Sequence, residues 1–215
     1  MALIIYFTKV PRYQNIFTNE YETLPFNDVQ LVNKYFNWKR ARAEHGVDCY
    51  SLKDWCGVSE DDMPHKGIVN YYRDFYNKKM AYNSYDSELV ETESIFEDLA
   101  RIVKANQIFN WMMNNVTNGN VDNDYYEVSE EKMTMLCRAL KMIRRNATLD
   151  DDGFHVNEDV AKEYMPVMDE VPLFWGTDKY DEVYAEQVVK TYYIIRNILN
   201  TTDFEKESIY FHAVW

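Results

Sequence analysis

The sequence contains few cysteines and few glycines, and these shortages exclude several common kinds of site. Its three cysteines, Cys49, Cys56 and Cys137, form no CxxC pair. An odd, unpaired set argues against a disulfide scaffold or a zinc site, so we expect reduced thiols in a cytosolic protein. None of the six glycines lies in a GxGxxG or GxxxxGK pattern, which argues against a dinucleotide-binding fold and a P-loop.

Long hydrophobic runs are also missing. No stretch approaches the roughly 20 apolar residues that span a bilayer as a helix. The apolar run near the start, at 2–8, is short and no basic segment precedes it. We therefore expect no signal peptide, no membrane segment and a cytoplasmic location.

Basic side chains are outnumbered by acidic ones. The chain has 23 Lys and Arg residues against 36 Asp and Glu residues, a formal net charge of −13. Because phosphate backbones repel a negative surface, we expect no broad nucleic-acid binding, which leaves room for a local basic pocket. Acidic excess usually serves solubility, and a second interpretation is that the surface imitates DNA and occupies a DNA-binding protein.

Motifs that carry catalysis are absent from the sequence. Each histidine is isolated, and none lies in HExxH or near GxSxG. The four are His45, His65, His155 and His212. The acidic run Asp150–Gly153 matches only part of a calcium loop. We therefore expect no catalytic residue, no metal and no cofactor, and a protein that is not an enzyme.

The periodic patterns that are present predict an α+β fold. Helices are predicted at 28–45, 51–55, 67–80, from 87 or 94 to about 116, at 129–145 and from 177 onward. Ser51 and Thr177 are the predicted caps of two of these helices. Strands are predicted at 2–8, 125–128 and 208–215, and segment 172–176 is predicted to be a strand or an extended segment. The fold would be mainly helical, with a small, mostly antiparallel sheet that includes the N- and C-terminal strands. We expect one compact domain over 1–215, with 91–215 as its core, 20–90 as a helical elaboration and a linker at 80–88.

The predicted helix at 95–116 contains an unexpected polar residue, Asn106. On a helical wheel it lies near the middle of an apolar face. That face consists of Ile95, Leu99, Ile102, Phe109, Met113 and Val116. A buried amide without partners costs about 1–3 kcal/mol, so Asn106 should bond to a structural network, to buried water or to a ligand. Lys104 and Trp111 point to the opposite face, which a second subunit or the N-terminal half would cover.

Four segments in a fixed order resemble a family of small, widespread bacteriophage proteins. The segments are KANQIFNWMMNNVTNG, DYYEVSEEKMTML, PLFWGTDKYDEVYAEQVV and IYFHAVW. The family shows a WRKANAIHxWFV-like helix, an NVQxG-like turn, a YYEVSxExL-like strand and helix, FFFGSxxYDEYY, and a terminal aromatic strand ending in Trp. The resemblance covers residues 97–215, slightly over half of the chain.

The resemblance implies a phage-encoded accessory protein in the cytoplasm of an infected bacterium, and it implies no reaction. The family's Trp, Arg and His are replaced here by Ile102, Val103 and Phe109. If the family's polar helix positions bind a ligand, the loss of Arg and His means either that the ligand differs here or that those residues were structural.

Two functional hypotheses follow. In the first, the protein counteracts host immunity by binding and sequestering a small nucleotide signal. The ligand-binding residues would be Lys104, Asn106, Trp111, Tyr125, Tyr126, Trp175 and Tyr180. Because Lys104 and Asn106 point to different faces of one predicted helix, this pocket requires a homo-oligomer or a domain boundary. In the second, the acidic surface inhibits a host nucleic-acid-binding or defence protein.

Overall fold

The structure is a computed structural model that describes residues 2–45, 51–82, 88–120, 122–150, 153–172 and 174–215. The chain divides into two compact units. The first, here called the core unit, comprises Met1–Thr8, Leu99–Phe204 and Ile209–Trp215, and the second unit comprises Lys9–Asp98 and Glu205–Ser208. The prediction of a single domain with an elaboration at 20–90 stays a prediction.

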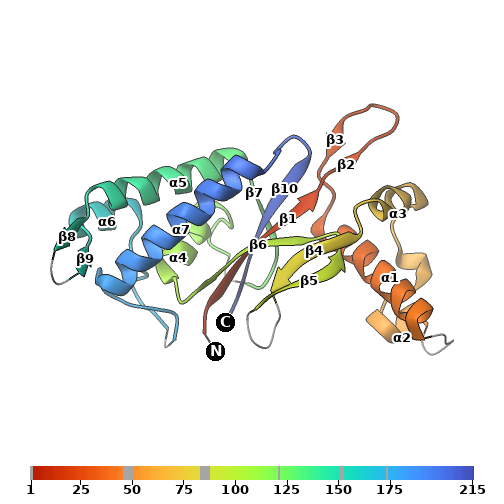
Figure 1. The fold of residues 1–215 in the computed structure, drawn as a ribbon, viewed down its shortest axis with the longest axis horizontal. Helices are drawn as coiled ribbons and strands as arrows, with labels where there is room; N and C mark the ends of the chain where they lie inside the picture. The colour runs from red at the N-terminus through yellow and green to blue at the C-terminus, as the bar shows by residue number, and fades with distance from the viewer. Residues whose placement is uncertain (1, 46–50, 83–87, 121, 151–152, 173) are drawn as a thin grey trace. The chain divides into compact units, whose positions relative to one another are not determined.

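A four-stranded antiparallel sheet contains both ends of the chain and confirms the predicted α+β class (Figure 1). Its order is β6-β1-β10-β7. The strands are β1 (Ile4–Pro11), β6 (Glu97–Val103), β7 (Tyr126–Val128) and β10 (Glu207–Val214). The predicted pairing of the first and last strands is therefore confirmed. Strand β10 pairs with β7 in the register Ile209↔Val128 and Phe211↔Tyr126.

Helices of the core unit cover one face of this sheet. They are α4 (Asn106–Asn115), α5 (Glu130–Arg145), α6 (Glu158–Tyr164) and α7 (Glu182–Thr201), and a hairpin of β8 (Thr148–Asp150) and β9 (Gly153–His155) connects α5 to α6. Ser129 caps α5 as predicted, because its side chain accepts from the Lys132 amide. The cap of α7 is Asp181 rather than the predicted Thr177.

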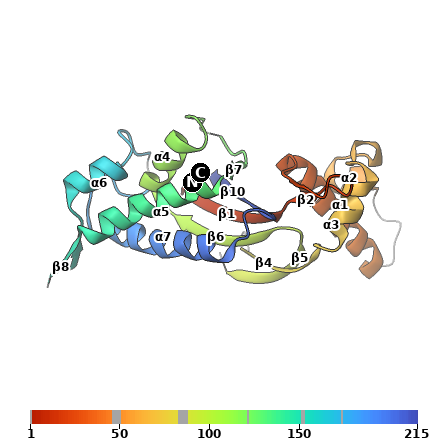
Figure 2. The ribbon, with the colours of Figure 1, turned by 90° about the horizontal axis from the view of Figure 1, so that it is seen from above.

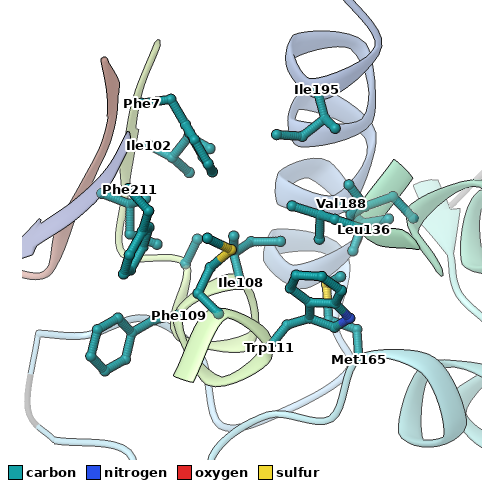
Figure 3. Close-up of a cluster of buried hydrophobic side chains, with 14 of the residues drawn as sticks. Phe7, Ile102, Ile108, Phe109, Trp111, Leu136, Met165, Val188, Ile195 and Phe211 are labelled. Atoms are coloured by element: carbon teal, nitrogen blue, oxygen red, sulfur yellow. The ribbon is translucent and has the colours of Figure 1, made fainter. Parts of the chain in front are cut away.

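The hydrophobic core of this unit lies between the sheet and the helices. Figure 3 shows Phe7, Ile102 and Phe211 of the strands facing side chains of α4 and α7. Trp111, on α4, is buried in the same cluster beside Met165. On α7, the side chains that face this core include Tyr184, Val188, Thr191, Ile195 and Ile198, all of them buried.

The second unit consists of helices and two hairpins. Its elements are β2 (Tyr13–Gln14), β3 (Tyr21–Glu22), α1 (Phe26–His45), α2 (Leu52–Cys56), a 3-10 turn at Glu60–Asp62, α3 (Lys66–Arg73), β4 (Asn77–Tyr82) and β5 (Leu89–Ser94). The short helix α2 confirms the Ser51 cap, which forms a capping box with Asp54. It ends at Gly57, whose φ of 75° is favourable for glycine.

Three predicted elements are wrong. The long helix ending near 116 is replaced by β5, β6 and the shorter α4, because Ala100 and Ile102 alternate into the core with strand periodicity. The helix at 67–80 ends at Arg73, and Asn77 begins β4. Segment 172–176 contains no strand among its described residues, since Phe174 and Gly176 both have positive φ. Most of the predicted linker, at 83–87, lies outside the described residues.

Candidate functional site

Asn106, which raised the question of a ligand, is the first residue of α4. The chain turns into this helix at Lys104, which has a left-handed φ of 58°. The Asn106 side chain is fully buried. Its Nδ2 donates to the Thr177 carbonyl at 2.6 Å, and its Oδ1 accepts from the Met168 amide at 3.1 Å. Both polar atoms thus have protein partners, as the structural alternative requires.

The Asn106 side chain joins the start of α4 to the segment between α6 and α7. Two further contacts reinforce this junction. Gly176 packs against the Lys104 carbonyl so closely that a Cβ on Gly176 would overlap the oxygen. Gln187 of α7 donates to the same carbonyl at 2.7 Å. The junction therefore connects α4 and α7 to Met168, Gly176 and Thr177 of the segment between α6 and α7.

Three predicted ligand-binding residues lie at or next to this junction. Asn106 is its centre, and the Lys104 carbonyl belongs to it, although the Lys104 side chain is exposed. Trp175 is buried, and its ring is 5.3 Å from those of Phe109 and Trp215. These contacts place Trp175 in the hydrophobic core.

The other four predicted residues each have partners of their own in the protein. The Tyr180 hydroxyl accepts from the Val167 amide at 3.3 Å, and Trp111 is a core residue. Tyr125 stacks on the His212 ring at 4.2 Å, and Tyr126 donates to Asp122 at 2.7 Å. The described structure does not gather the seven residues into one cavity, and their role in ligand binding stays a prediction.

A groove of about 670 Å³ lies beside α4. Its lining residues are Asn110, Asn114, Pro166, Val167, Met168, Asp169 and Glu170. Within that described lining the only charged side chains are the carboxylates of Asp169 and Glu170. Phosphate would be repelled here, so this groove does not suit a nucleotide.

A different part of the core unit carries the opposite charge. Residues 132–149 and 187–202 contain no Asp or Glu. Their bases are Lys132, Arg138, Lys141, Arg144, Arg145, Lys190 and Arg196. The two segments are adjacent in space, because α5 packs along α7 in both views (Figures 1 and 2). A locally basic surface therefore forms on a chain whose net charge is −13, although Lys190 at its edge pairs with Glu186 at 3.0 Å.

Arg144 and two tyrosines form the centre of this surface. The Arg144 guanidinium carbon lies 5.2 Å from the centroid of the Tyr192 ring and 5.3 Å from that of Tyr193. Tyr192 is 6% exposed, whereas Tyr193 is 49% exposed. Both rings thus contact the guanidinium through cation–π interactions. The part of the Tyr193 ring that is exposed to solvent is the surface that a ligand could reach. We call Lys141, Arg144, Tyr192, Tyr193 and Arg196 the α5–α7 cluster.

The cations of the α5–α7 cluster are not neutralised by carboxylates. Among the described residues, no ion pair involves Lys141, Arg144 or Arg196. Burial raises the pKa of the Cys137 thiol, and the positive charges of Lys141 and Arg196 oppose that rise. These two cations are therefore close enough to act on one thiol. Uncompensated like charges repel each other, and an anion bound among them would relieve that repulsion.

The described part of the chain contains neither a metal site nor a membrane-spanning helix. It holds no group of three or more His, Cys, Asp or Glu side chains arranged to bind a metal ion. None of its helices is both long and apolar enough to cross a membrane.

Comparisons with known proteins give no match: no protein-family model, no curated protein and no solved structure matches this chain.

Sequence reasoning did not find the α5–α7 cluster. In the sequence, Arg144 and Arg145 are fully accounted for as favourable charges in the last turn of a helix. The available signal was the absence of acids over 132–149 and 187–202. That signal becomes informative only once α5 and α7 are known to pack together.

Proposed function

We propose that this protein is a non-enzymatic binding protein that sequesters a small nucleotide at the α5–α7 cluster. The nucleotide's phosphate would lie among Lys141, Arg144 and Arg196, and its base would stack on Tyr193. The observation that carries the proposal is the Arg144 guanidinium, held against two tyrosine rings without a carboxylate partner.

Phosphate fits this arrangement for electrostatic and geometric reasons. Arginine presents planar donors that match two phosphate oxygens, and a charge-assisted hydrogen bond contributes about 1.5–3 kcal/mol. The guanidinium of Arg144 is already oriented by Tyr192, so less conformational entropy is lost on binding. The net charge of −13 disfavours long polyanions elsewhere on the surface. A short ligand with few phosphates suits a local cluster better.

The nucleobase would stack on the exposed part of the Tyr193 ring. Stacking of a nucleobase on an aromatic ring contributes about 1–3 kcal/mol, with little dependence on base identity. A tyrosine that is 49% exposed on a helix surface can offer such a stacking face. Stacking and phosphate contact together distinguish a nucleotide from inorganic phosphate.

The resemblance to phage proteins supports a setting for this activity. In this proposal the protein acts in the cytoplasm of an infected bacterium and withdraws a nucleotide signal from host immunity. Sequestration needs binding without turnover.

Calorimetric titration tests the proposal. The probes are inorganic phosphate, adenosine monophosphate, a linear dinucleotide, and cyclic di- and trinucleotides, all at one ionic strength. We expect at least one nucleotide to bind more tightly than phosphate. Arg144→Gln should weaken that binding by roughly ten-fold or more, the effect of losing about 1.4 kcal/mol. Tyr193→Ala should weaken it similarly, whereas Arg73→Gln, an exposed arginine of α3, should not. Failure of every probe to bind, or equal binding by wild type and Arg144→Gln, would overturn the proposal.

A further inference from the structure

The outward side of α5 presents alternating methionines and arginines. Met135, Arg138, Met142 and Arg145 recur at i, i+3, i+7 and i+10, which places them on one side of the helix. Met135 is 39% exposed and Met142 is 37% exposed, and both arginines are exposed. The buried side of α5 carries Leu136, Leu140 and Ile143 instead. We call the outward set the Met–Arg stripe.

This composition is typical of protein interfaces. Methionine and arginine are enriched at contact surfaces, and the flexible thioether adapts to irregular apolar partners. In the described structure, neither Arg138 nor Arg145 forms an ion pair. A fitting partner would therefore offer apolar side chains with negative charge beside them. The stripe shares no residue with the α5–α7 cluster, whose Arg144 contacts Tyr192 and Tyr193 of α7.

The second unit carries a segment with those properties at the tip of the β2–β3 hairpin. Ile16 is 77% exposed and Phe17 is 91% exposed. Residues 13–27 contain Glu20 and Glu22 but no Lys or Arg. Two adjacent, exposed apolar side chains with carboxylates beside them form a small apolar patch with a polar rim, the arrangement that interaction sites show.

Hydrogen bonds order the hairpin tip. The Asn15 side chain accepts from the Phe17 amide at 2.9 Å and donates to Glu22 at 2.8 Å. The Asn19 amide donates to the Asn15 carbonyl at 2.8 Å, with Asn19 in a left-handed conformation at φ 61°. Because the tip is already ordered, docking would lose little backbone entropy.

We infer that the β2–β3 hairpin tip of one copy docks on the Met–Arg stripe of a second copy. Phe17 and Ile16 would pack between Met135 and Met142, and Glu20 would lie near Arg138 or Arg145. Apolar side chains then meet thioethers, and carboxylates meet guanidinium groups, so shape and charge are complementary. An anionic membrane fits the tip poorly, because the tip has acids and no bases.

The expected association is weak and reversible. A phenylalanine buries at most about 150–250 Å², so one such contact is smaller than a standard protein interface. We expect a dissociation constant on the order of tens of micromolar for the contact. Because the hairpin and the stripe are different surfaces, the contact closes into a reciprocal dimer or extends into larger assemblies.

Sedimentation velocity between about 1 and 300 μM tests the inference. We expect the wild type to associate with rising concentration, and Phe17→Ser to stay monomeric. Phe174→Ser removes another exposed phenylalanine, 57% exposed in the core unit, and should associate like the wild type. The double variant Arg138→Glu/Arg145→Glu should be monomeric alone. Far-ultraviolet circular dichroism verifies that each variant is folded.

Mixing the variants separates this contact from other routes to association. Phe17→Ser keeps the stripe, and Arg138→Glu/Arg145→Glu keeps the hairpin tip, so their mixture should form a complex although neither associates alone. A wild type that is monomeric throughout the concentration range overturns the inference. Association that survives Phe17→Ser, or a mixture that stays monomeric, overturns it as well.

Discussion

Gly176 lies directly against the main-chain carbonyl of Lys104. A Cβ on Gly176 would overlap that oxygen and would lie 3.1 Å from the Asn106 side-chain nitrogen. Gly176 also has a φ of 127°, which side chains rarely adopt. We therefore predict that Gly176→Ala lowers the free energy of unfolding by about 3 kcal/mol or more, through combined overlap and backbone strain.

Urea denaturation of Gly176→Ala beside Gly119→Ala measures this effect. Gly119 also has positive φ, at 84°, but nothing lies within 4 Å of its added Cβ. The control should cost only about 1–2 kcal/mol, the penalty of the left-handed conformation. Equal losses in the two variants would show that close packing at Lys104 is unimportant.

Asn106→Ala tests the structural role of the buried amide. The substitution leaves the Thr177 carbonyl and the Met168 amide without their partner. We predict a loss of about 2–4 kcal/mol in the free energy of unfolding, because two partly buried groups lose their partner and a cavity replaces a fully buried side chain. Asn110→Ala removes two exposed bonds at the groove edge, one donated to the Pro166 carbonyl and one accepted from Asn114, and should cost only about 1 kcal/mol.

The same variant separates stability from binding. Nucleotide affinity of folded Asn106→Ala should equal that of the wild type, because the α5–α7 cluster does not include this residue. Unchanged stability with lost binding would contradict this account and assign Asn106 to a ligand.

Lys9 lies on β1, in the part of the sheet that belongs to the second unit, and its ion pairs connect β1 to β6 and β10. Its ammonium nitrogen lies 2.9 Å from Glu97 of β6 and 3.4 Å from Glu207 of β10. Burial lowers the pKa of Lys9, but the bonds and charges of Glu97 and Glu207 outweigh burial and raise the pKa above its ordinary 10.5. A raised lysine pKa stabilises the fold fully below the unfolded-state value, and this contribution is lost as pH rises through the folded-state value.

Lys9→Met should therefore cost about 1–2 kcal/mol between pH 7 and 9, and the difference from wild type should shrink above the ordinary pKa of 10.5. Urea denaturation of both proteins, at pH 7 to 9 and again above pH 10.5, measures this difference in the free energy of unfolding. Lys78→Met removes an exposed pair with Glu91 and should change stability little. A pH-independent difference for Lys9→Met would mean that packing of the lysine stem, not its charge, is responsible.

The sequence correctly predicts those elements whose ends are determined by residues close to them in the chain. Ser51 and Ser129 cap helices because their hydroxyls reach amides three residues ahead. The terminal strands were predictable from their aromatic and β-branched runs. The strand β6 was not predictable, because no glycine or proline marks its end. Its end depends on the left-handed Lys104, whose carbonyl is held by Gln187, more than 80 residues away.

The candidate site could not be predicted from the sequence either, because its residues come together only in the tertiary structure. Asn106 was correctly singled out as a buried polar residue, but its partners Thr177 and Met168 come from a segment that follows α6. The α5–α7 cluster joins Arg144 to Tyr193 across almost 50 residues of sequence. Charge patterning shows where acids are missing but not which helices lie together.

Native mass spectrometry tests the central claim, nucleotide binding at Arg144, most directly. Wild type, Arg144→Gln and Arg73→Gln are purified in parallel from a bacterial host, incubated with the nucleotide panel and desalted. The account predicts a nucleotide retained at fixed stoichiometry by wild type and Arg73→Gln, released on denaturation, and depleted in Arg144→Gln. Equal retention by all three proteins, or retention by none, would contradict it.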